Sequence, residues 1–143
     1  MISVVMPSYL GAYKRAAKNR DDKIVRAIKS VQVQTYKDWE LLVIADGCEK
    51  TVEIVSAIKD KKVKLHSISK QALWSGAVRN KGLSEAIGDY ACYLDIDDAI
   101  YHEWECILRQ FEAKQYDNIV CCYDKDKRIA FMKAWTEYNS KDR

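Results

Sequence analysis

The chain has 143 residues, of which 48% are hydrophobic and 31% are charged. This length predicts one domain with a buried core, which excludes a disordered or peptide-like chain. The 24 basic and 21 acidic side chains nearly cancel to a net charge of +3. Charge alone therefore provides no large basic surface for nucleic acid, and partners have to be inferred from local sites.

The sequence lacks an apolar run near the roughly 20 residues that a membrane span needs. Its beginning, MISVVMPSYL, lacks the basic region and cleavage site of a signal peptide, so we expect a cytoplasmic protein without a membrane span. The cysteines are odd in number and show no C-x-x-C spacing, which predicts reduced, partly buried thiols. They are Cys48, Cys92, Cys106, Cys121 and Cys122.

The first half of the chain alternates apolar runs with helical patterns. Residues 2–6 form a β-branched run that predicts a buried strand ending at Pro7. Asp21 or Asp22 is a candidate cap for a helix whose apolar positions 24, 27, 28 and 31 follow helical spacing. Before it, residues 10–22 are polar and basic and predict a loop or a short helical turn. Strands are then predicted at 40–45 and 63–68, with a helix at 51–59 between them.

The second half continues the alternation. Residues 76–87 predict a helix that ends in a left-handed cap at Gly88, and residues 90–94 predict the next strand. A helix at 101–113, a strand at 118–122 and a closing helix at 128–138 follow. Continuous apolar strands that alternate with helices are typical of a mostly parallel sheet covered on both faces. We therefore expect one α/β domain, residues 1–143, with three layers in α/β/α order.

Polar signals follow three of these strands. Ligands of open α/β sheets bind at the carboxyl ends of the strands, so the three segments should meet at one edge. Each has a simpler explanation alone: a proline can end a strand, a tyrosine can pack, Asp-Gly can form a turn, and Asp98 can cap a helix. Their coincidence at one edge indicates a binding site. The segments are Pro7-Ser8-Tyr9, Asp46-Gly47 and Asp95-Ile96-Asp97-Asp98.

The acidic segment indicates a cation site. Two carboxylates about 4 Å apart repel by roughly 1 kcal/mol in water and about 4 kcal/mol near a protein surface. One or two carboxylates together with ligand phosphates suit Mg²⁺ or Mn²⁺, which makes a nucleoside diphosphate a natural ligand. A calcium loop starting at Asp95 is excluded, because Ile100 and Cys106 stand where it needs Gly and Glu. The sequence contains no P-loop and no G-x-G-x-x-G, so metal and Arg or Lys would have to hold the phosphates.

Three stretches carry a resemblance to a known family: SVVMPSYL, AIKSVQVQTYKDWELLVIADGC and GAVRNKGLSEAIGDYACYLDIDD. In order and spacing, they resemble the N-terminal half of family 2 glycosyltransferases with the GT-A fold. The similarity runs from Ile2 to Asp98. It implies a Rossmann-like, nucleotide-diphospho-sugar transferase fold, here with a short C-terminal part.

The resemblance also implies roles for single residues. Pro7, Ser8 and Tyr9 match the P-[ST]-Y loop, whose aromatic ring packs on the nucleotide base. Asp46 matches the second acid of the D-D-G-S segment, which hydrogen-bonds the base. The remaining matches concern the phosphates, the ribose and the metal: Arg79 and Asn80 in the A-R-N segment, Asp95 and Asp97 in the D-x-D signature, and Asp97 with Asp98 nearest the ribose and the metal.

The implied activity is a metal-dependent, inverting transfer of a sugar from a UDP-sugar to a hydroxyl of a glycan or polysaccharide. A cation, Mn²⁺ or Mg²⁺, would stabilise the charge on the leaving diphosphate. The attacking hydroxyl must lose a proton, so a general base is also needed. No acid after Asp98 matches a motif that would assign it. The candidates are Glu103, Glu105, Asp124, Asp126 and Glu137.

The sequence departs from the family pattern in three places. Ala45 stands where the first Asp of D-D-G is usual, which should weaken or change base recognition. The segment after Tyr9 is longer than usual, and its basic residues either reach the diphosphate or form a solvated loop. Only 45 residues follow Asp98, fewer than the acceptor-binding half usually contains. The basic residues of the long segment are Lys14, Arg15, Lys18 and Arg20.

Two other functions compete with an active transferase. A truncated or degenerate transferase domain could hold nucleotide or a partner chain without turnover. A receiver-like signalling domain also gathers carboxylates at strand ends, but it places them after its first strand, where this chain has Pro7-Ser8. A homodimer or docking partner is expected if C-terminal aromatic side chains stay exposed. These are Trp104, Phe111, Phe131 and Trp135.

Overall fold

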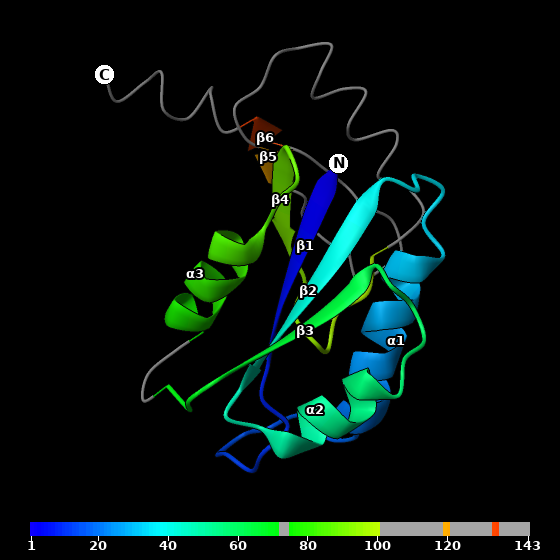
Figure 1. Cartoon of the computed structure of the whole chain (residues 1–143). Helices are drawn as coiled ribbons and strands as arrows, with labels where there is room; N and C mark the ends of the chain where they lie inside the picture. The colour runs from blue at the N-terminus through cyan, green and yellow to red at the C-terminus, as the bar shows by residue number, and fades with distance from the viewer. Residues whose placement is uncertain (72–74, 101–118, 121–132, 135–143) are drawn as a thin grey trace, which may run out of the picture. The chain divides into compact units, whose positions relative to one another are not determined.

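The computed structural model describes residues 1–71, 75–100, 119–120 and 133–134 (Figure 1). The chain divides into two compact units, Met1–Ile100 and Tyr101–Arg143. In the second unit, β5 (Ile119–Val120) pairs antiparallel with β6 (Lys133–Ala134). β5 lies within the predicted strand at 118–122. β6 lies within the predicted helix at 128–138, so that prediction is wrong at these two residues, because pairing with a distant strand leaves no mark on local periodicity. The helix predicted at 101–113 lies outside the described residues.

The first unit contains a four-stranded sheet in the order β3-β2-β1-β4, and every neighbouring pair is parallel. This confirms the predicted parallel sheet. β2 is central and is buried at each of its eight positions, as expected for a strand covered on both faces. The strands are β1 (Ile2–Ser8), β2 (Trp39–Asp46), β3 (Val63–Ile68) and β4 (Tyr90–Tyr93).

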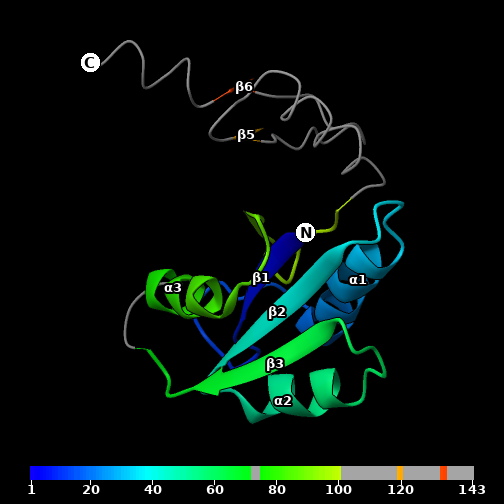
Figure 2. The same ribbon diagram turned by 45° about the horizontal axis from the view of Figure 1, so that its top comes forward.

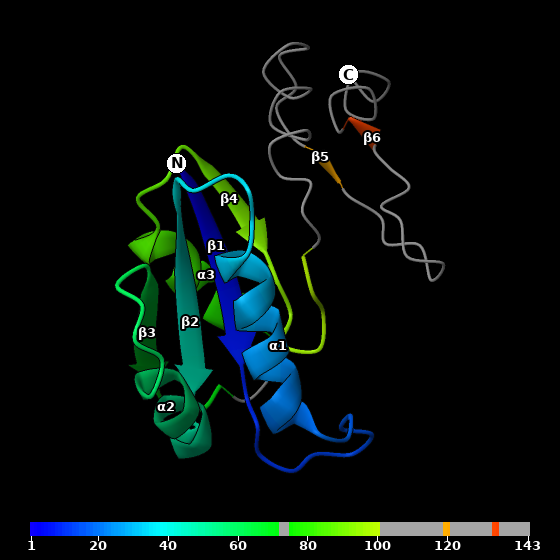
Figure 3. The same cartoon turned by 90° about the vertical axis from the view of Figure 1, so that its right-hand side faces the viewer.

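Three helices cover the sheet: α1 (Arg20–Gln32), α2 (Glu49–Ser56) and α3 (Gly76–Glu85). The connections through α1 and α2 move along the sheet from β1 to β3, whereas the connection through α3 returns to β4. Right-handed crossovers therefore place α1 and α2 on one face and α3 on the other. Figures 2 and 3 show these three layers, which confirm the predicted α/β/α arrangement.

The core lies on both faces of β1 and β2. Val5, Leu42, Ile44 and Val78 form a buried cluster between the sheet and α3. α3 packs so closely that a Cβ on Gly82 would lie 2.2 Å from Cγ1 of Val5. On the other face, α1 buries the positions that helical spacing predicted, which are Ile24, Ala27, Ile28 and Val31.

Pro7 does not end β1, contrary to prediction, because the strand continues to Ser8. The Val5 carbonyl accepts a hydrogen bond from the N–H of Leu94, so Val5 faces β4. Pro7 is two residues further along and faces the same side, beyond the last paired residue of β4. Its missing N–H therefore breaks no ladder bond, which is why the strand accepts a proline there.

The predicted cap of α1 is also wrong. The helix begins at Arg20, and its N-cap is Asn19, which makes no side-chain cap hydrogen bond. Asp21 and Asp22 lie inside the first turn, where their charges favour the positive end of the helix dipole. The acidic residues thus support the helix start electrostatically.

The ends of α2 and α3 differ from prediction too. α2 begins two residues before the predicted range of 51–59 and ends at Ser56. α3 ends at Glu85, and Gly88 is not in the left-handed conformation that a cap would need. Glycine is required there for a different reason: a Cβ would lie 2.7 Å from the Met1 carbonyl oxygen and 2.8 Å from the Ser3 nitrogen.

A buried polar cluster ties the first residues of β1 and β2 to the end of α3. The carboxylate of Glu40 accepts hydrogen bonds from the Ser3 hydroxyl, the Lys64 ammonium and the Ile87 N–H, at 2.6, 2.6 and 2.9 Å. Burial alone would raise the pKa of Glu40, but these donors together hold it below its ordinary value. The cluster lies at the opposite edge of the sheet from the strand ends where a ligand would bind.

Two further predictions concern membranes and cysteines. Among the described residues, no helix is long and apolar enough to cross a membrane. Cys48 and Cys92 form no disulfide, which agrees with the predicted thiols. The other three cysteines lie outside the described part of the chain.

Candidate functional site

A pocket of about 490 Å³ opens at the carboxyl ends of β1, β2 and β4. This volume lies within the usual range for small-molecule sites, roughly 300–1,000 Å³. The three predicted polar segments all contribute to it, so the topology brings them together as expected from the strand order. The lining residues are Pro7, Ser8, Tyr9, Tyr13, Asp46, Lys70, Gln71, Ser75, Val78, Asp95, Ile96 and Asp97.

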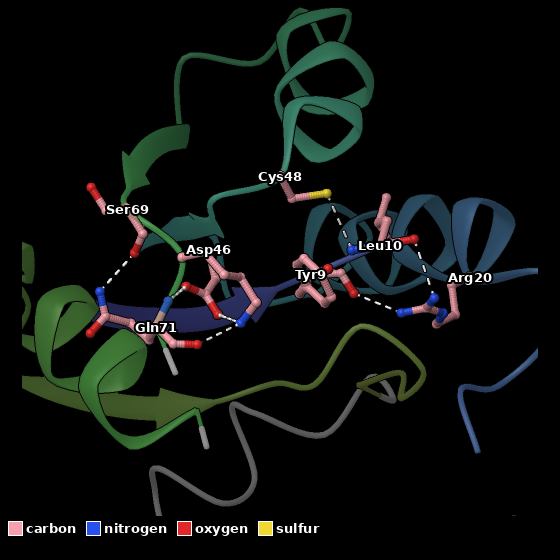
Figure 4. Close-up of polar contacts among 8 residues, drawn as sticks. Tyr9, Leu10, Arg20, Asp46, Cys48, Ser69 and Gln71 are labelled. Atoms are coloured by element: carbon pink, nitrogen blue, oxygen red, sulfur yellow. Dashed lines mark hydrogen bonds and ion pairs between the residues drawn. The ribbon is translucent and has the colours of Figure 1, made fainter. Parts of the chain in front are cut away.

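Arg20 holds the loop that carries Tyr9. Its guanidinium donates hydrogen bonds to the carbonyls of Tyr9, Leu10 and Gly11 at 2.7, 3.2 and 2.6 Å. Figure 4 shows Arg20 reaching back to the first two of these residues. The same guanidinium lies 4.7 Å from the ring centre of Tyr13, a cation–π contact. The first helical residue of α1 therefore fixes the backbone of the loop at the pocket.

A second anchor of this loop comes from α2. The Leu10 N–H donates to Sγ of Cys48 at 3.3 Å, as Figure 4 shows, and the hydroxyls of Ser8 and Thr51 lie 2.8 Å apart. Burial alone would raise the pKa of the Cys48 thiol, but hydrogen bonds from the Thr51 hydroxyl and from backbone N–H groups lower it. The end of β1 is thus fastened to both helices that cover this face of the sheet.

Asp46 lies at the end of β2 with 7% of its surface exposed. Its carboxylate accepts the Gln71 N–H and pairs with the Lys70 ammonium, each at 2.7 Å. The Lys70 ammonium also lies 4.4 Å from the ring centre of Tyr9. Gly47 has a φ of +59°, and a Cβ there would lie within 2.8 Å of Lys70 backbone atoms, so only glycine permits this close approach. The segment after β3 therefore closes onto the end of β2.

The acidic segment is held by two arginines from different helices. Arg79 of α3 pairs with Asp95 at 2.8 Å, and Arg26 of α1 donates to the backbone carbonyl of Asp97 at 2.7 Å. The N–H of Asp98 donates to the Asp95 carbonyl at 3.0 Å, which forms a turn. Burial, then the negative charges of Asp97 and Asp95, raises the pKa of Asp98 above its ordinary value, while Arg26 opposes this rise.

α1 also binds the chain just after the acidic segment. The Ile100 N–H donates to the Ser30 hydroxyl at 2.8 Å, and the Gln34 amide donates to the Ile100 carbonyl at 3.2 Å. With Arg26, these residues are four apart and lie on one face of the helix. One rigid helix thus positions both the Tyr9 loop and the acidic segment.

Most residues singled out from the sequence reach the pocket. Pro7, Ser8, Tyr9, Asp46, Asp95 and Asp97 line it. Arg79 reaches it only through its ion pair with Asp95, and Asn80 is an exposed residue of α3. Asp98 does not line the pocket but follows Asp97 directly.

Sequence reasoning missed Tyr13, Lys70 and Gln71 as pocket residues. Lys70 and Gln71 follow β3 closely, so the same strand-end rule could have indicated them. Arg20 has a role that neither alternative for the basic segment included, because it binds backbone carbonyls. Ala45 is fully buried and lies outside the pocket lining.

The described residues contain no ready-made cluster of three or more His, Cys, Asp or Glu side chains that could hold a metal ion. The donor set is nevertheless suitable for Mg²⁺ or Mn²⁺ that arrives with phosphates, because such sites need only one or two protein carboxylates. In addition, Nε of Arg79 is buried without a hydrogen-bond partner among the described residues. Such an orphan donor indicates room for an acceptor such as a phosphate oxygen.

The parallel sheet and the pocket at its strand ends define a ligand-binding domain of the open α/β class. A profile of Glycosyl transferase family 2 matches residues 3–139, so the chain belongs to glycosyl transferase family 2. This confirms the resemblance drawn from the three sequence stretches. The solved structure of TarS from S. aureus has a TM-score of 0.65 at 24% identity and covers 79% of this chain and 32% of TarS. This similarity supports the expected GT-A fold.

Curated relatives carry the same family relationship. An uncharacterized glycosyltransferase of Rickettsia conorii is 38% identical over 104 residues, which are 71% of this chain and 15% of the relative. The amylovoran biosynthesis glycosyltransferase AmsB of Erwinia amylovora is 30% identical over 106 residues, 71% of this chain and 31% of AmsB. The chain therefore spans less than a third of the length of these two relatives.

Proposed function

We propose that this chain binds a nucleoside diphosphate sugar, with a UDP-sugar as donor, and takes part in its transfer to a hydroxyl of a glycan or polysaccharide. The observation that carries the proposal is the pocket itself. It gathers Tyr9, Asp46 and Asp97 from the ends of three different strands, in a chain of glycosyl transferase family 2. TarS of S. aureus, whose fold is similar, has been solved in complex with UDP and with UDP-GlcNAc.

Each part of the pocket has a role in this proposal. The Tyr9 ring stacks on the base, and the Asp46 carboxylate accepts a hydrogen bond from it. Pro7 and Ser8 set the direction of the loop, and Arg79 keeps Asp95 in place next to the diphosphate. Tyr9 and Asp46 lie at one part of the lining and the acidic segment at another, which suits a ligand with a base at one end and phosphates at the other.

Asp97 with Asp98 would hold Mn²⁺ or Mg²⁺. When bound, such a cation stabilises the negative charge on the departing diphosphate. We further propose that the transfer inverts the anomeric centre and that the acceptor hydroxyl gives its proton to a general base. The five acidic candidates for this base, from Glu103 to Glu137, lie outside the described residues. The match over residues 3–139 supports treating both compact units as parts of one family domain, residues 1–143.

Thermal unfolding tests donor binding. UDP with Mn²⁺ at about 100 times its Kd should stabilise the chain by about 2.7 kcal/mol. For a chain of this size, that corresponds to a rise in Tm of roughly 5–10 °C. Asp97→Asn should remove the Mn²⁺-dependent part of the rise, whereas the matched control Asp22→Asn, an exposed acid of α1, should keep it. An equal rise in both variants would contradict the metal role of Asp97.

Turnover separates an enzyme from the second candidate function, a module that binds nucleotide without transfer. A panel of nucleotide sugars with Mn²⁺ and glycan acceptors should give released UDP with a suitable pair. Binding of UDP with neither transfer nor hydrolysis across the panel would favour the binding module. Loss of binding altogether would contradict both.

A further inference from the structure

The base-binding part of the pocket is already in contact with a side chain of the protein. The Lys70 ammonium pairs with Asp46 at 2.7 Å, donates to the Gln71 carbonyl at 2.8 Å and lies 4.4 Å from the Tyr9 ring centre. Tyr9 and Asp46 are the two residues that the proposed function assigns to the base. A single lysine thus engages both.

A base and the Lys70 ammonium need the same space. Stacked aromatic rings have centres roughly 4.5–7 Å apart, which is the distance range that the ammonium now occupies over Tyr9. The carboxylate of Asp46 is also in use, since one oxygen accepts the Gln71 N–H and the other accepts the ammonium. A base that stacks on Tyr9 and donates to Asp46 therefore has to move the lysine side chain.

The structure permits this movement for the side chain alone. The backbone of Lys70 is held against Gly47, whose N–H donates to the Ile68 carbonyl at 2.9 Å. The side chain of Lys70 is 46% exposed, so its ammonium can turn into water without disturbing the core. Displacement then costs the cation–π contact and the ion pair with Asp46.

We propose that Lys70 sets the affinity and selectivity of the base-binding part of the pocket by capping Tyr9 and Asp46 until a base displaces it. This inference rests on the proposed nucleotide function. Bases that both stack on Tyr9 and donate an N–H to Asp46 replace the two lost contacts. Ligands that offer only phosphates replace neither and leave the cap in place.

Uridine is the decisive probe, because it has no phosphate that the lysine charge could attract. Lys70→Ala should lower the Kd of uridine by about three- to tenfold, the equivalent of one lost cation–π contact and a weak ion pair. Lys70→Arg, which keeps a cation, should bind uridine no more tightly than the wild type. Lys61→Ala removes the same charge from an exposed turn and should leave the Kd unchanged.

The cap can also be observed without any ligand. In the wild-type protein, the ring current of Tyr9 should shift the NMR signals of the Lys70 ε-methylene group upfield, and Tyr9→Leu should abolish this shift. Saturating uridine should change the signals toward those of an exposed lysine. Random-coil values in the ligand-free wild type would overturn the proposal.

The outcomes separate this proposal from the proposed function. If the wild type binds UDP with Mn²⁺ but Lys70→Ala binds uridine equally or more weakly, Lys70 is a bystander or a ligand contact, and only the cap is refuted. If neither the wild type nor Lys70→Ala binds uridine or UDP, both proposals fail. Tighter binding by Lys70→Ala supports both.

Discussion

Replacing Arg20 by lysine should loosen the Tyr9 loop while leaving the sheet intact. The guanidinium binds three backbone carbonyls at 2.6–3.2 Å, but a single ammonium cannot span them, so we expect two of the three bonds to be lost. A hydrogen bond of this kind contributes a net of about 0.5–1.5 kcal/mol. Two lost bonds therefore cost about 1–2 kcal/mol locally, which makes opening of the loop roughly 5- to 30-fold more frequent.

Hydrogen exchange at the Leu10 amide measures this opening, because its N–H is bonded to Sγ of Cys48 inside the loop anchor. Arg20→Lys should speed its exchange by that factor, while exchange of the β2 amides stays unchanged. The uridine Kd should rise in parallel, since an open loop does not hold Tyr9 for stacking. Arg15→Lys, at an exposed position of the same segment, is the matched control. Unchanged exchange at Leu10 would refute the role given to Arg20.

Two further predictions concern the framework. The pKa of Glu40 is lowered in the folded state, so its contribution to stability is present above its ordinary pKa of 4.5 and is lost as pH falls through the folded-state value. Urea unfolding should therefore show a gap in unfolding free energy between wild type and Glu40→Gln at pH 7 that shrinks by pH 3; a constant gap would count against this. Gly82→Ala gains about 1 kcal/mol in helix propensity, but its Cβ would lie 2.2 Å from the buried Val5, and overpacking costs about 1–3 kcal/mol. We expect a net loss in Tm, whereas Gly76→Ala in the same helix, with nothing within 4 Å, should not lower it.

The strands and their parallel order were predictable because their signal is local. A strand buried on both faces is a continuous apolar run, and β2 is such a run from Leu41 to Ala45. The boundary errors have local explanations that only neighbours supply. Pro7 continues β1 because β4 is too short to need its N–H, and Gly88 is required by the closeness of Ser3 and the Met1 carbonyl.

The candidate site divides in the same way. Tyr9, Asp46 and Asp97 stand at strand ends in motifs that the eye can find in one sequence. The supporting residues carry no such mark. Arg26 reads as an ordinary helix surface arginine, and Lys70 as one lysine among many, until the fold brings them to Asp97 and Asp46.

The sequence by itself determined the α/β class, the parallel strands, the family and the strand ends at which polar residues gather, because hydrophobic periodicity and short motifs are properties of neighbouring residues. The tertiary structure alone decided which side chains meet across 24 or more positions. It set Lys70 over Tyr9 and against Asp46, and it set Arg26 against Asp97. The physical reason is that such contacts depend on the packing of whole helices and strands, which no local pattern records.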